Sequence, residues 1–413
     1  MSELPAGVRR FVLSESLLGI GIGLFSLLLN FHLLALGVRE ETLGTLNAVG
    51  TVAMGMAAFP IAVAARRYGR KGLFISGIAL IGTGYLLFAA GTTLFLFYGA
   101  QIVMSVGMAL LITTEIQLLF HYAQDPALET TSYSLMFAVF TLFTGVGTLL
   151  GGVLPDLLGG VTSPYQGSLC LAGAVVIGLA VLRGLILPRE TRSMARQPIA
   201  IRSVRAYRER MLPGGKIFRL ALFVFIAGVA FALIGPFQNV ILKFRFGVSD
   251  AAVSGVIGAA SLFLFFGSLW TPRVIAALGP VRAYYALFAL NAALLFVLAL
   301  PLSFAPFTAL FLLRGGAFTM LSNLIESQTM SMIADAHRDA YAAIRNVFRS
   351  VGTAGASYVA GRLLERGGYR LPFFITGVVI VLGLIYFTVW IRPLITDSVA
   401  RQRKATPAND PQG

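Results

Sequence analysis

The sequence predicts an all-α membrane protein with twelve transmembrane helices in two six-helix bundles. Its composition, a series of apolar runs and an internal repeat support this fold class. Of the 413 residues, 57% are hydrophobic and only 12% are charged, whereas soluble domains carry about 25% charged residues. So large an apolar excess must face lipid instead of water. We therefore expect an integral membrane protein.

Twelve runs of mostly apolar residues follow one another along the chain, each long enough to cross a bilayer as a helix. They cover residues 11–36, 43–65, 72–90, 94–121, 132–154, 167–187, 220–242, 251–275, 282–300, 304–332, 341–363 and 371–391. Lipid offers no partner to unpaired backbone groups and no alternating barrel pattern is visible, so all twelve are predicted to be helices. The first run lacks a cleavage pattern and is predicted to be retained.

The second half of the chain repeats the first. A shift of 210 residues aligns Gly37 with Gly247 and Gly69 with Gly279. Six helices running the same way in each half predict parallel repeats related by an axis along the membrane normal. We expect an N-terminal bundle over residues 1–187, a cytoplasmic linker over 188–219, and a C-terminal bundle with a cytoplasmic tail over 220–413.

Positive charge predicts the orientation. With the N-terminus placed inside, 24 of the 32 Lys and Arg residues lie on its side and 6 on the other. Because cytoplasmic loops collect Lys and Arg, both termini are predicted to be cytoplasmic, in a bacterial inner membrane. This topology signal explains the net charge of +15 without a nucleic-acid partner. The basic stretch 202–211 is either a lipid-contacting helix or a solvated connector.

Two short patterns stand out: AVAARRYGRK at residues 62–71 and GTLLGG at residues 147–152. The first is similar to the loop motif G-x-L-A-D-R-x-G-R-K, and the second to the antiporter pattern G-P-x-x-G-G, of the major facilitator superfamily of secondary transporters. The chain resembles that superfamily over nearly its whole length. In the second pattern Thr148 replaces proline. The matched gating-loop positions are Arg67, Gly69, Arg70 and Lys71, whereas Arg66 replaces the aspartate.

The resemblance implies the major facilitator fold, with the first, fourth, seventh and tenth helices around one central cavity. Since the motif's aspartate is missing, we expect the basic loop to bind a helix end or a lipid phosphate through charge. The sequence has no phosphate-binding loop for ATP and no H-E-x-x-H pattern for zinc. Its single cysteine, Cys170, has no partner for a disulfide or a Cys-based metal site. We expect a monomer that is not an enzyme and has no cofactor.

Three carboxylates inside predicted helices are candidates for proton coupling, because an ionisable group within a span is costly and is usually retained for function. They are Glu115, Glu326 and Glu15. By depth all three lie toward the cytoplasmic ends, where a solvated interfacial charge is the alternative. We expect Glu115 and Glu326 to face each other across the cavity, and Glu15, nearest the interface, to tolerate replacement best.

Polar side chains on the predicted cavity helices are candidates for substrate binding. They are Asn30, His32, Gln101, Gln238, Asn239, Arg314 and Asn323. A buried packing role is the alternative for His32, and Arg314 either binds substrate or ties helices together. Gly235 and Pro236 are expected to break the seventh helix. The run GIGIG at residues 19–23 lies inside an apolar span, so it is predicted to pack helices.

These features favour a proton-coupled antiporter that exports a small amphipathic organic molecule by alternating access. Its partners would be that substrate, protons and membrane lipids. A second hypothesis is uptake or exchange of an organic anion through Arg314, Lys243 and Arg245. A third is a lipid translocase or a non-transporting receptor on the same fold. An enzyme is not expected, because no nucleophile, base and orienting group occur at usable spacing.

Overall fold

A computed structural model describes residues 4–188, 215–333 and 338–396, and its regular structure there is helical. Most of the predicted linker and most of the predicted tail therefore lie outside the described residues. The helices of the first half are α1 (Ala6–Ala35), α2 (Glu40–Tyr68), α3 (Arg70–Ala90), α4 (Leu94–Ala123), α5 (Pro126–Gly151), the short α6 (Leu154–Leu158) and α7 (Gln166–Ile186).

The second half begins with α9 (Gly215–Ala232), which starts inside the predicted linker. A 3-10 turn, η1 (Gly235–Phe237), separates α9 from α10 (Gln238–Phe246), so the seventh predicted span is broken at the expected Gly-Pro pair. The remaining helices are α11 (Asp250–Leu278), α12 (Pro280–Leu298), α13 (Phe304–Ser331), α14 (Arg338–Glu365) and α15 (Leu371–Tyr386), which continues into the π-turn η3 (Phe387–Ile391).

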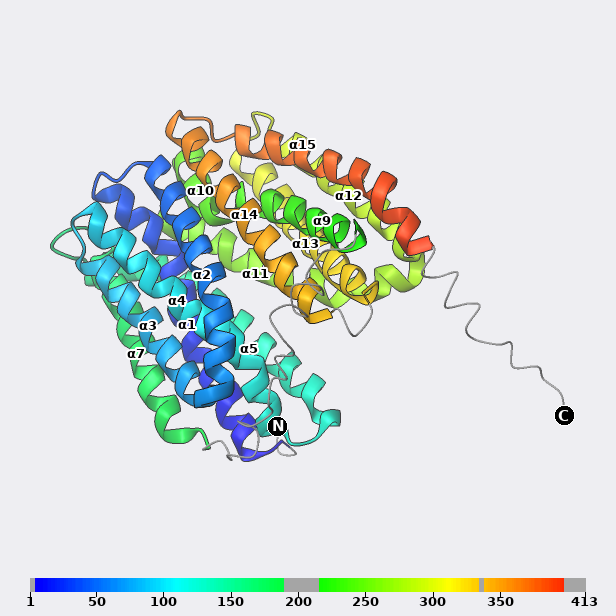
Figure 1. Ribbon diagram of the computed structural model, residues 1–413. Helices are drawn as coiled ribbons and strands as arrows, with labels where there is room; N and C mark the ends of the chain where they lie inside the picture. Colours follow the sequence, from blue (N-terminus) through cyan, green and yellow to red (C-terminus); the bar gives the residue numbers. More distant parts are fainter. Residues whose placement is uncertain (1–3, 189–214, 334–337, 397–413) are drawn as a thin grey trace.

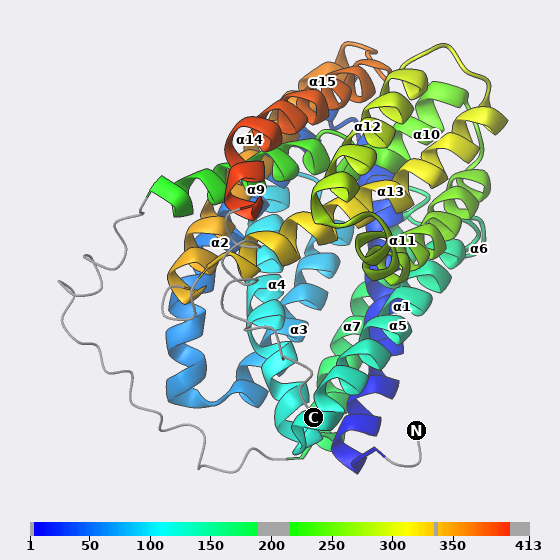
Figure 2. The ribbon, with the colours of Figure 1, turned by 90° about the vertical axis from the view of Figure 1, so that its right-hand side faces the viewer.

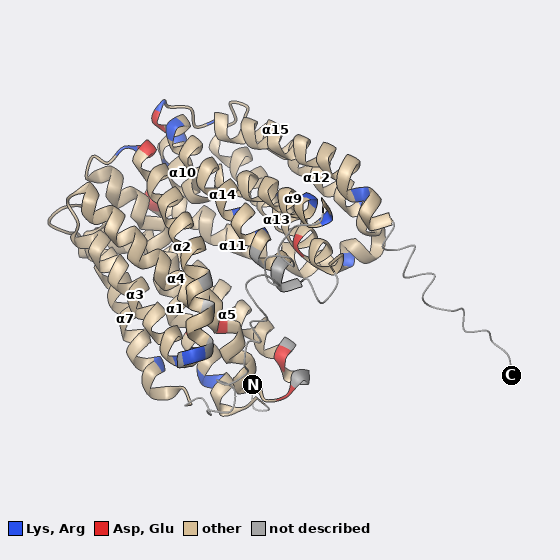
Figure 3. Ribbon diagram, in the orientation of Figure 1, with Lys and Arg blue, Asp and Glu red and all other residues tan. Residues whose placement is uncertain are grey.

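Ten helices in the described part of the chain are long and apolar enough to cross a membrane, two fewer than the twelve predicted spans. The two predicted spans missing from this set are α2 and α14. These helices pack against each other, and α14 carries Arg345, Arg349 and Arg362 along its length. A helix that faces another helix and a cavity has less need of apolar residues than one surrounded by lipid. Figure 3 shows that charged residues otherwise gather near helix ends.

The helices form two groups, α1–α7 and α9–α15 (Figure 1). Within the first group α1 packs on α5 and α7, and α3 on α4 and α7; within the second, α9 packs on α14, and α12 on α13 and α15. The groups contact each other through α2 with α14 and α5 with α11. They diverge toward the end at which the N-terminus lies (Figures 1 and 2).

The backbone shows the repeat that the sequence contains. Gly37 and its counterpart Gly247 have φ of 81° and 62°, and Gly69 and its counterpart Gly279 have φ of 87° and 74°. This left-handed region costs a residue with a Cβ about 1–2 kcal/mol, so glycine is required at each turn. The same sharp turns therefore follow the first and second helix of each half.

Small residues let the first and fifth helix of each half approach closely. On α1, a Cβ at Gly19 would come within 2.7 Å of the Phe140 carbonyl oxygen, and Gly23 contacts the Thr144 backbone. In the second half, a Cβ at Gly228 would come within 3.0 Å of the Arg349 carbonyl oxygen. The GIGIG run therefore packs helices, as predicted from its place in an apolar span.

We predict that replacing Gly147 by alanine destabilises the protein by about 1–3 kcal/mol, because the new Cβ would collide with the backbone of Ile20. Thermal unfolding of the purified protein in detergent measures this. The matched control is Gly178→Ala on α7, where nothing lies within 4 Å of the new Cβ. Equal unfolding temperatures for the two variants would refute close α1–α5 packing as a source of stability.

Candidate functional site

A cavity of about 770 Å³ lies between the two groups of helices. Residues of α1, α4, η1–α10 and α13 line it, which is the arrangement that the resemblance implied for the first, fourth, seventh and tenth helices. Residues of α2, α3, α5, α9, α11 and α14 complete the wall. A cavity of this size accommodates a small organic molecule.

The wall of the cavity is amphipathic. Its amide and hydroxyl side chains are Ser26, Asn30, Asn47, Thr51, Gln101, Thr148, Gln238, Asn239, Ser322, Ser350, Thr353 and Ser357. Its aromatic and methionine side chains are Phe25, Tyr85, Phe231, Phe318, Met54, Met104 and Met108. Among the lining residues that the structure describes, Arg349 alone is charged at neutral pH. The predicted binding residues Asn30, Gln101, Gln238 and Asn239 therefore lie in the wall.

A pair of asparagines closes the cavity at the end remote from the N-terminus. The Asn30 amide donates to the Pro236 carbonyl at 2.8 Å and to the Asn239 side-chain oxygen at 2.9 Å. Asn239 in turn donates to the Leu27 carbonyl at 2.6 Å. Because η1 interrupts the helix between α9 and α10, the Pro236 carbonyl is available to accept this bond. Both asparagines thus tie α1 to α10 in this conformation.

Ion pairs join the two groups at the same end. Arg362 contacts Glu41 at 3.2 Å, and Arg39 pairs with Glu365. A Cβ at Gly361 would come within 2.9 Å of the Gly44 Cα, so the backbones of α2 and α14 touch beside these pairs. In the described part of the chain, every side-chain tie between the groups that we identify lies at this end. The cavity is closed there, and the helices diverge toward the N-terminal side.

Lys243 and Arg245 form contacts at this closed end and do not line the cavity. Lys243 contacts Asp250 at 2.5 Å and donates to the Tyr165 hydroxyl at 2.7 Å, and that hydroxyl donates to Asp250 at 2.9 Å. Burial raises the pKa of the Tyr165 hydroxyl, which keeps its proton available for this bond. Arg245 donates to the Leu298 carbonyl at 3.0 Å. In this conformation both basic side chains contact groups at the closed end, and neither is among the residues that line the cavity.

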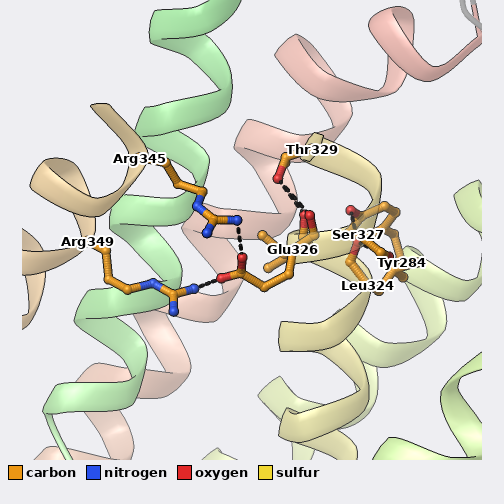
Figure 4. A network of polar contacts seen from close by, with 8 residues as sticks. Tyr284, Leu324, Glu326, Ser327, Thr329, Arg345 and Arg349 are labelled. Carbon is orange, nitrogen blue, oxygen red and sulfur yellow. Dashed lines mark hydrogen bonds and ion pairs between the residues drawn. The ribbon is translucent and has the colours of Figure 1, made fainter. Parts of the chain in front are cut away.

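Glu326 on α13 contacts two arginines of α14 (Figure 4). Its two carboxylate oxygens pair with Arg345 and Arg349, which lie one helical turn apart. The carboxylate is 27% exposed and Arg349 is 41% exposed, so the cluster borders open space. Ser322, one turn from Glu326 on α13, lines the cavity. We call Glu326, Arg345 and Arg349 the α13–α14 charge cluster.

A second cluster lies inside the first group of helices. Arg183 pairs with Glu15 and donates its Nε to the Ser14 hydroxyl at 2.9 Å, and both charged side chains are almost completely buried. Its guanidinium lies 4.9 Å from the Phe11 ring centroid. The carboxyl group of Glu115 lies beside that of Glu15, so two carboxyl groups and one guanidinium share this buried site. Two sequence expectations are corrected: Glu115 lies beside Glu15 instead of facing Glu326, and Glu15 is buried instead of solvated.

Three predicted binding residues lie outside the cavity wall. The ring of His32 contacts the Ser163 hydroxyl at 2.6 Å and the Phe88 carbonyl at 3.1 Å, which is the packing role weighed as its alternative. Asn323 donates to the Ser268 hydroxyl at 3.0 Å and so ties α13 to α11. Arg314 is buried with its charge 4.7 Å from the Phe318 ring centroid. These contacts position helices in the present conformation.

The gating loop reaches a helix end. Lys71 donates to the Leu187 carbonyl at 2.6 Å and to the Gly184 carbonyl at 3.1 Å, at the C-terminus of α7. A cation there meets the negative end of the helix dipole. This agrees with the expectation that the loop binds through charge. The side chain of Arg66 lies outside the described residues.

The sequence reasoning missed Arg345 and Arg349 as site residues. The available signal was their spacing of four residues, which puts both guanidinium groups on one face of a predicted helix. Arg183 was likewise not predicted as a partner of Glu15. What identifies these arginines is the carboxylate that each meets across the bundle, and no pattern within one helix reveals that partner.

Comparison with known proteins gives the family. The sequence model of the Major Facilitator Superfamily matches residues 11–356 and 220–411. The chain belongs to this superfamily. Its fold is accordingly that of a secondary transporter, and the protein is a multi-pass membrane protein. No curated protein matches the chain by sequence.

Solved structures of other transporters share the fold. The nucleoside transporter NupG is 13% identical with a TM-score of 0.74, over 92% of this chain and 98% of its own. A bacterial homologue of the human lysosomal transporter Spinster is 14% identical with a TM-score of 0.71, over 94% and 97%. A bacterial metal transporter is 14% identical with a TM-score of 0.64, over 94% and 99%. At such identities the likeness concerns the fold.

We predict that Glu15 and Glu115 substitute for each other as the counter-ion of Arg183. Either Glu→Gln variant alone leaves one carboxylate to ionise, so each costs little stability. The double variant leaves a buried guanidinium uncompensated and should cost about 3–5 kcal/mol. Thermal unfolding in detergent measures all three proteins. Adding Arg183→Gln to the double variant should restore stability, and a double variant as stable as either single one would contradict the shared role.

Proposed function

We propose that this protein is a secondary active transporter that moves a small amphipathic organic molecule by alternating access, coupled to protons through Glu326. The observation that supports this most is the charge cluster beside the cavity: a carboxylate held by two arginines at the wall of a 770 Å³ space. The lining offers amides and hydroxyls for orientation and aromatic and methionine surface for an apolar body.

Alternating access requires a closed end that opens at modest cost. The ties at the closed end are partly exposed ion pairs, such as Arg362 with Glu41, together with the bonds of Asn30 and Asn239. Exposed ion pairs contribute about 0–1 kcal/mol each, so this end is held by many weak contacts. The break at η1 lets α9 and α10 move separately. We infer that a substrate that binds the opposite conformation more tightly can shift the protein to that conformation.

Proton coupling needs a carboxylate whose charge changes the conformation or the binding site. Glu326 joins α13 to α14, and α14 is also the helix that packs on α2 across the groups. A proton on Glu326 would release two arginines from that contact. Glu15 and Glu115 remain a second proposed proton site, set within the first bundle and away from the cavity wall.

The direction of transport depends on whether the substrate moves in exchange for protons or together with them. The GTLLGG pattern favoured export in exchange for protons. In the structure Gly147 packs on α1 and Gly152 on α11. Such helix packing is equally compatible with export and with uptake. With cytoplasmic termini, as the charge distribution predicts, the cavity would open to the cytoplasm. We place the protein in a bacterial inner membrane, as a monomer with lipids around it.

We predict that Glu326→Gln lowers pH-gradient-driven transport at least tenfold while counterflow exchange of substrate survives, because the variant keeps hydrogen bonding but loses the titrating proton. Proteoliposomes with a panel of radiolabelled organic molecules, assayed with and without a pH gradient, measure both activities. The variant Asp156→Asn, at an exposed residue of α6, is the control and should transport normally.

Accumulation by Glu326→Gln at the wild-type rate would exclude this carboxylate as the coupling group and leave the Glu15 and Glu115 pair. If the wild-type protein transports no compound of the panel in either direction, the lipid translocase or receptor hypothesis becomes the better one. The sign of the gradient that drives accumulation distinguishes export by exchange from uptake together with protons.

A further inference from the structure

The charge at the cavity wall is positive and is not balanced there. Arg349 is the charged residue among the described lining residues, and its side chain is 41% exposed. Across the cavity, the wall from α2 and α4 offers uncharged groups such as Asn47, Gln101 and Met104. A partly desolvated cation beside neutral walls attracts an anion, because an opposite charge best offsets its lost hydration.

Glu326 neutralises only half of the cluster. It is one carboxylate shared by two guanidinium groups, so the α13–α14 charge cluster carries one net positive charge when Glu326 is ionised. Arg349 contacts Glu326 through its Nη2 atom. A guanidinium has five N–H donors in a planar fork, so donors remain for the two oxygens of a further carboxylate.

Within the described part of the chain, the neighbouring helices bring no second negative charge to the cluster. Among the side chains that the structure describes, the polar groups around it are neutral or basic. They are Tyr284 of α12, which donates to the Leu324 carbonyl; Lys216 of α9, which donates to the Met332 carbonyl; Ser268 of α11, bonded to Asn323; and Tyr341 of α14, next to Arg345. Counted over the described side chains, the cluster therefore keeps one net positive charge beside the cavity.

We propose that Arg349 is the anion subsite of this cavity and that its ligand is a small organic molecule with one carboxylate and an uncharged body. The ligand carboxylate takes the place of Glu326 on Arg349, while Arg345 keeps Glu326. The body then lies against the aromatic and amide wall formed by residues such as Phe318 and Gln101. The subsite specifies the substrate class of the proposed function. Transport of the anion rests on that function, whereas its binding does not.

Glu326 is then an internal competitor of the ligand. Protonating Glu326 removes the competing negative charge from Arg349. Binding of the proton therefore raises the affinity for the organic anion, and binding of the anion raises the affinity for the proton by the same factor. Two ligands that favour each other's binding cross together. The subsite therefore links the anion to protons moving the same way, which an inward proton gradient would convert to uptake.

Binding to the purified full-length protein in detergent tests the subsite without transport. The probes are phenylacetate with phenylacetamide and indole-3-acetate with indole-3-acetamide, pairs that differ in charge at nearly constant shape. Equilibrium binding of each radiolabelled probe is measured near pH 7. We expect the wild-type protein to prefer the carboxylate of a pair by about tenfold, equivalent to about 1.4 kcal/mol.

Two variants are expected to move this preference in opposite directions. Arg349→Gln should abolish it, and Glu326→Gln should increase it by about tenfold, since the internal carboxylate no longer competes. The exposed Arg273 of α11 supplies the control Arg273→Gln, which should bind like the wild type.

The proposal fails if the wild-type protein binds no carboxylate better than its amide, or if the preference survives in Arg349→Gln. It also fails if Glu326→Gln binds carboxylates more weakly than the wild type. This second test remains valid even if Arg349→Gln does not fold. Carboxylate binding that behaves as expected, with no transport of any compound in liposomes, would refute the proposed function and leave the subsite intact.

Discussion

The cost of holding charge inside a bilayer governs the rest of this structure. An ionised group at the centre of a membrane costs several kcal/mol unless an opposite charge meets it. Arg183 meets Glu15, with Glu115 beside it, and Arg345 and Arg349 meet Glu326. Each cluster bridges different helices, so satisfying the charges also fixes how these helices are arranged. The buried charges are in this sense structural elements of both bundles.

The two clusters differ in their access to the cavity. The Glu15–Arg183 pair lies within one bundle and is closed off by aromatic rings. The α13–α14 charge cluster is partly exposed, borders the cavity and keeps one positive charge in excess. The first arrangement suits a rigid bundle. The second can exchange a partner, because a ligand carboxylate is able to replace Glu326 on Arg349.

The small residues explain how such charges and a cavity coexist with a mobile interface. Within each bundle, glycine lets the first and fifth helices touch along the backbone, as Gly23 does on Thr144 and Gly228 on Arg349. Between the bundles, close contacts such as Gly44 with Gly361 gather at the closed end. Each bundle is thus packed along its length, whereas the bundles meet mainly at one end. Rigid bodies joined in this way can rock about their interface.

The sequence alone determined the class of fold. Apolar runs of bilayer length, the repeat of Gly37 and Gly69 at Gly247 and Gly279, and the Gly-Pro break of the seventh helix all appear in the structure, because each is set by local chemistry. It also identified four residues of the cavity wall from amide side chains on predicted cavity helices, whereas the amide of Asn323 on such a helix bonds Ser268 instead. Their partners were not predictable.

Only the tertiary structure decided which charge meets which. Glu115 and Glu326 were predicted at similar depths, yet one lies beside Glu15 and the other contacts Arg345 and Arg349, all residues of other helices. The same holds for Lys243, whose charge is used at the closed end. Periodicity specifies the face of a helix on which a side chain lies, but the neighbour opposite that face depends on how whole helices pack.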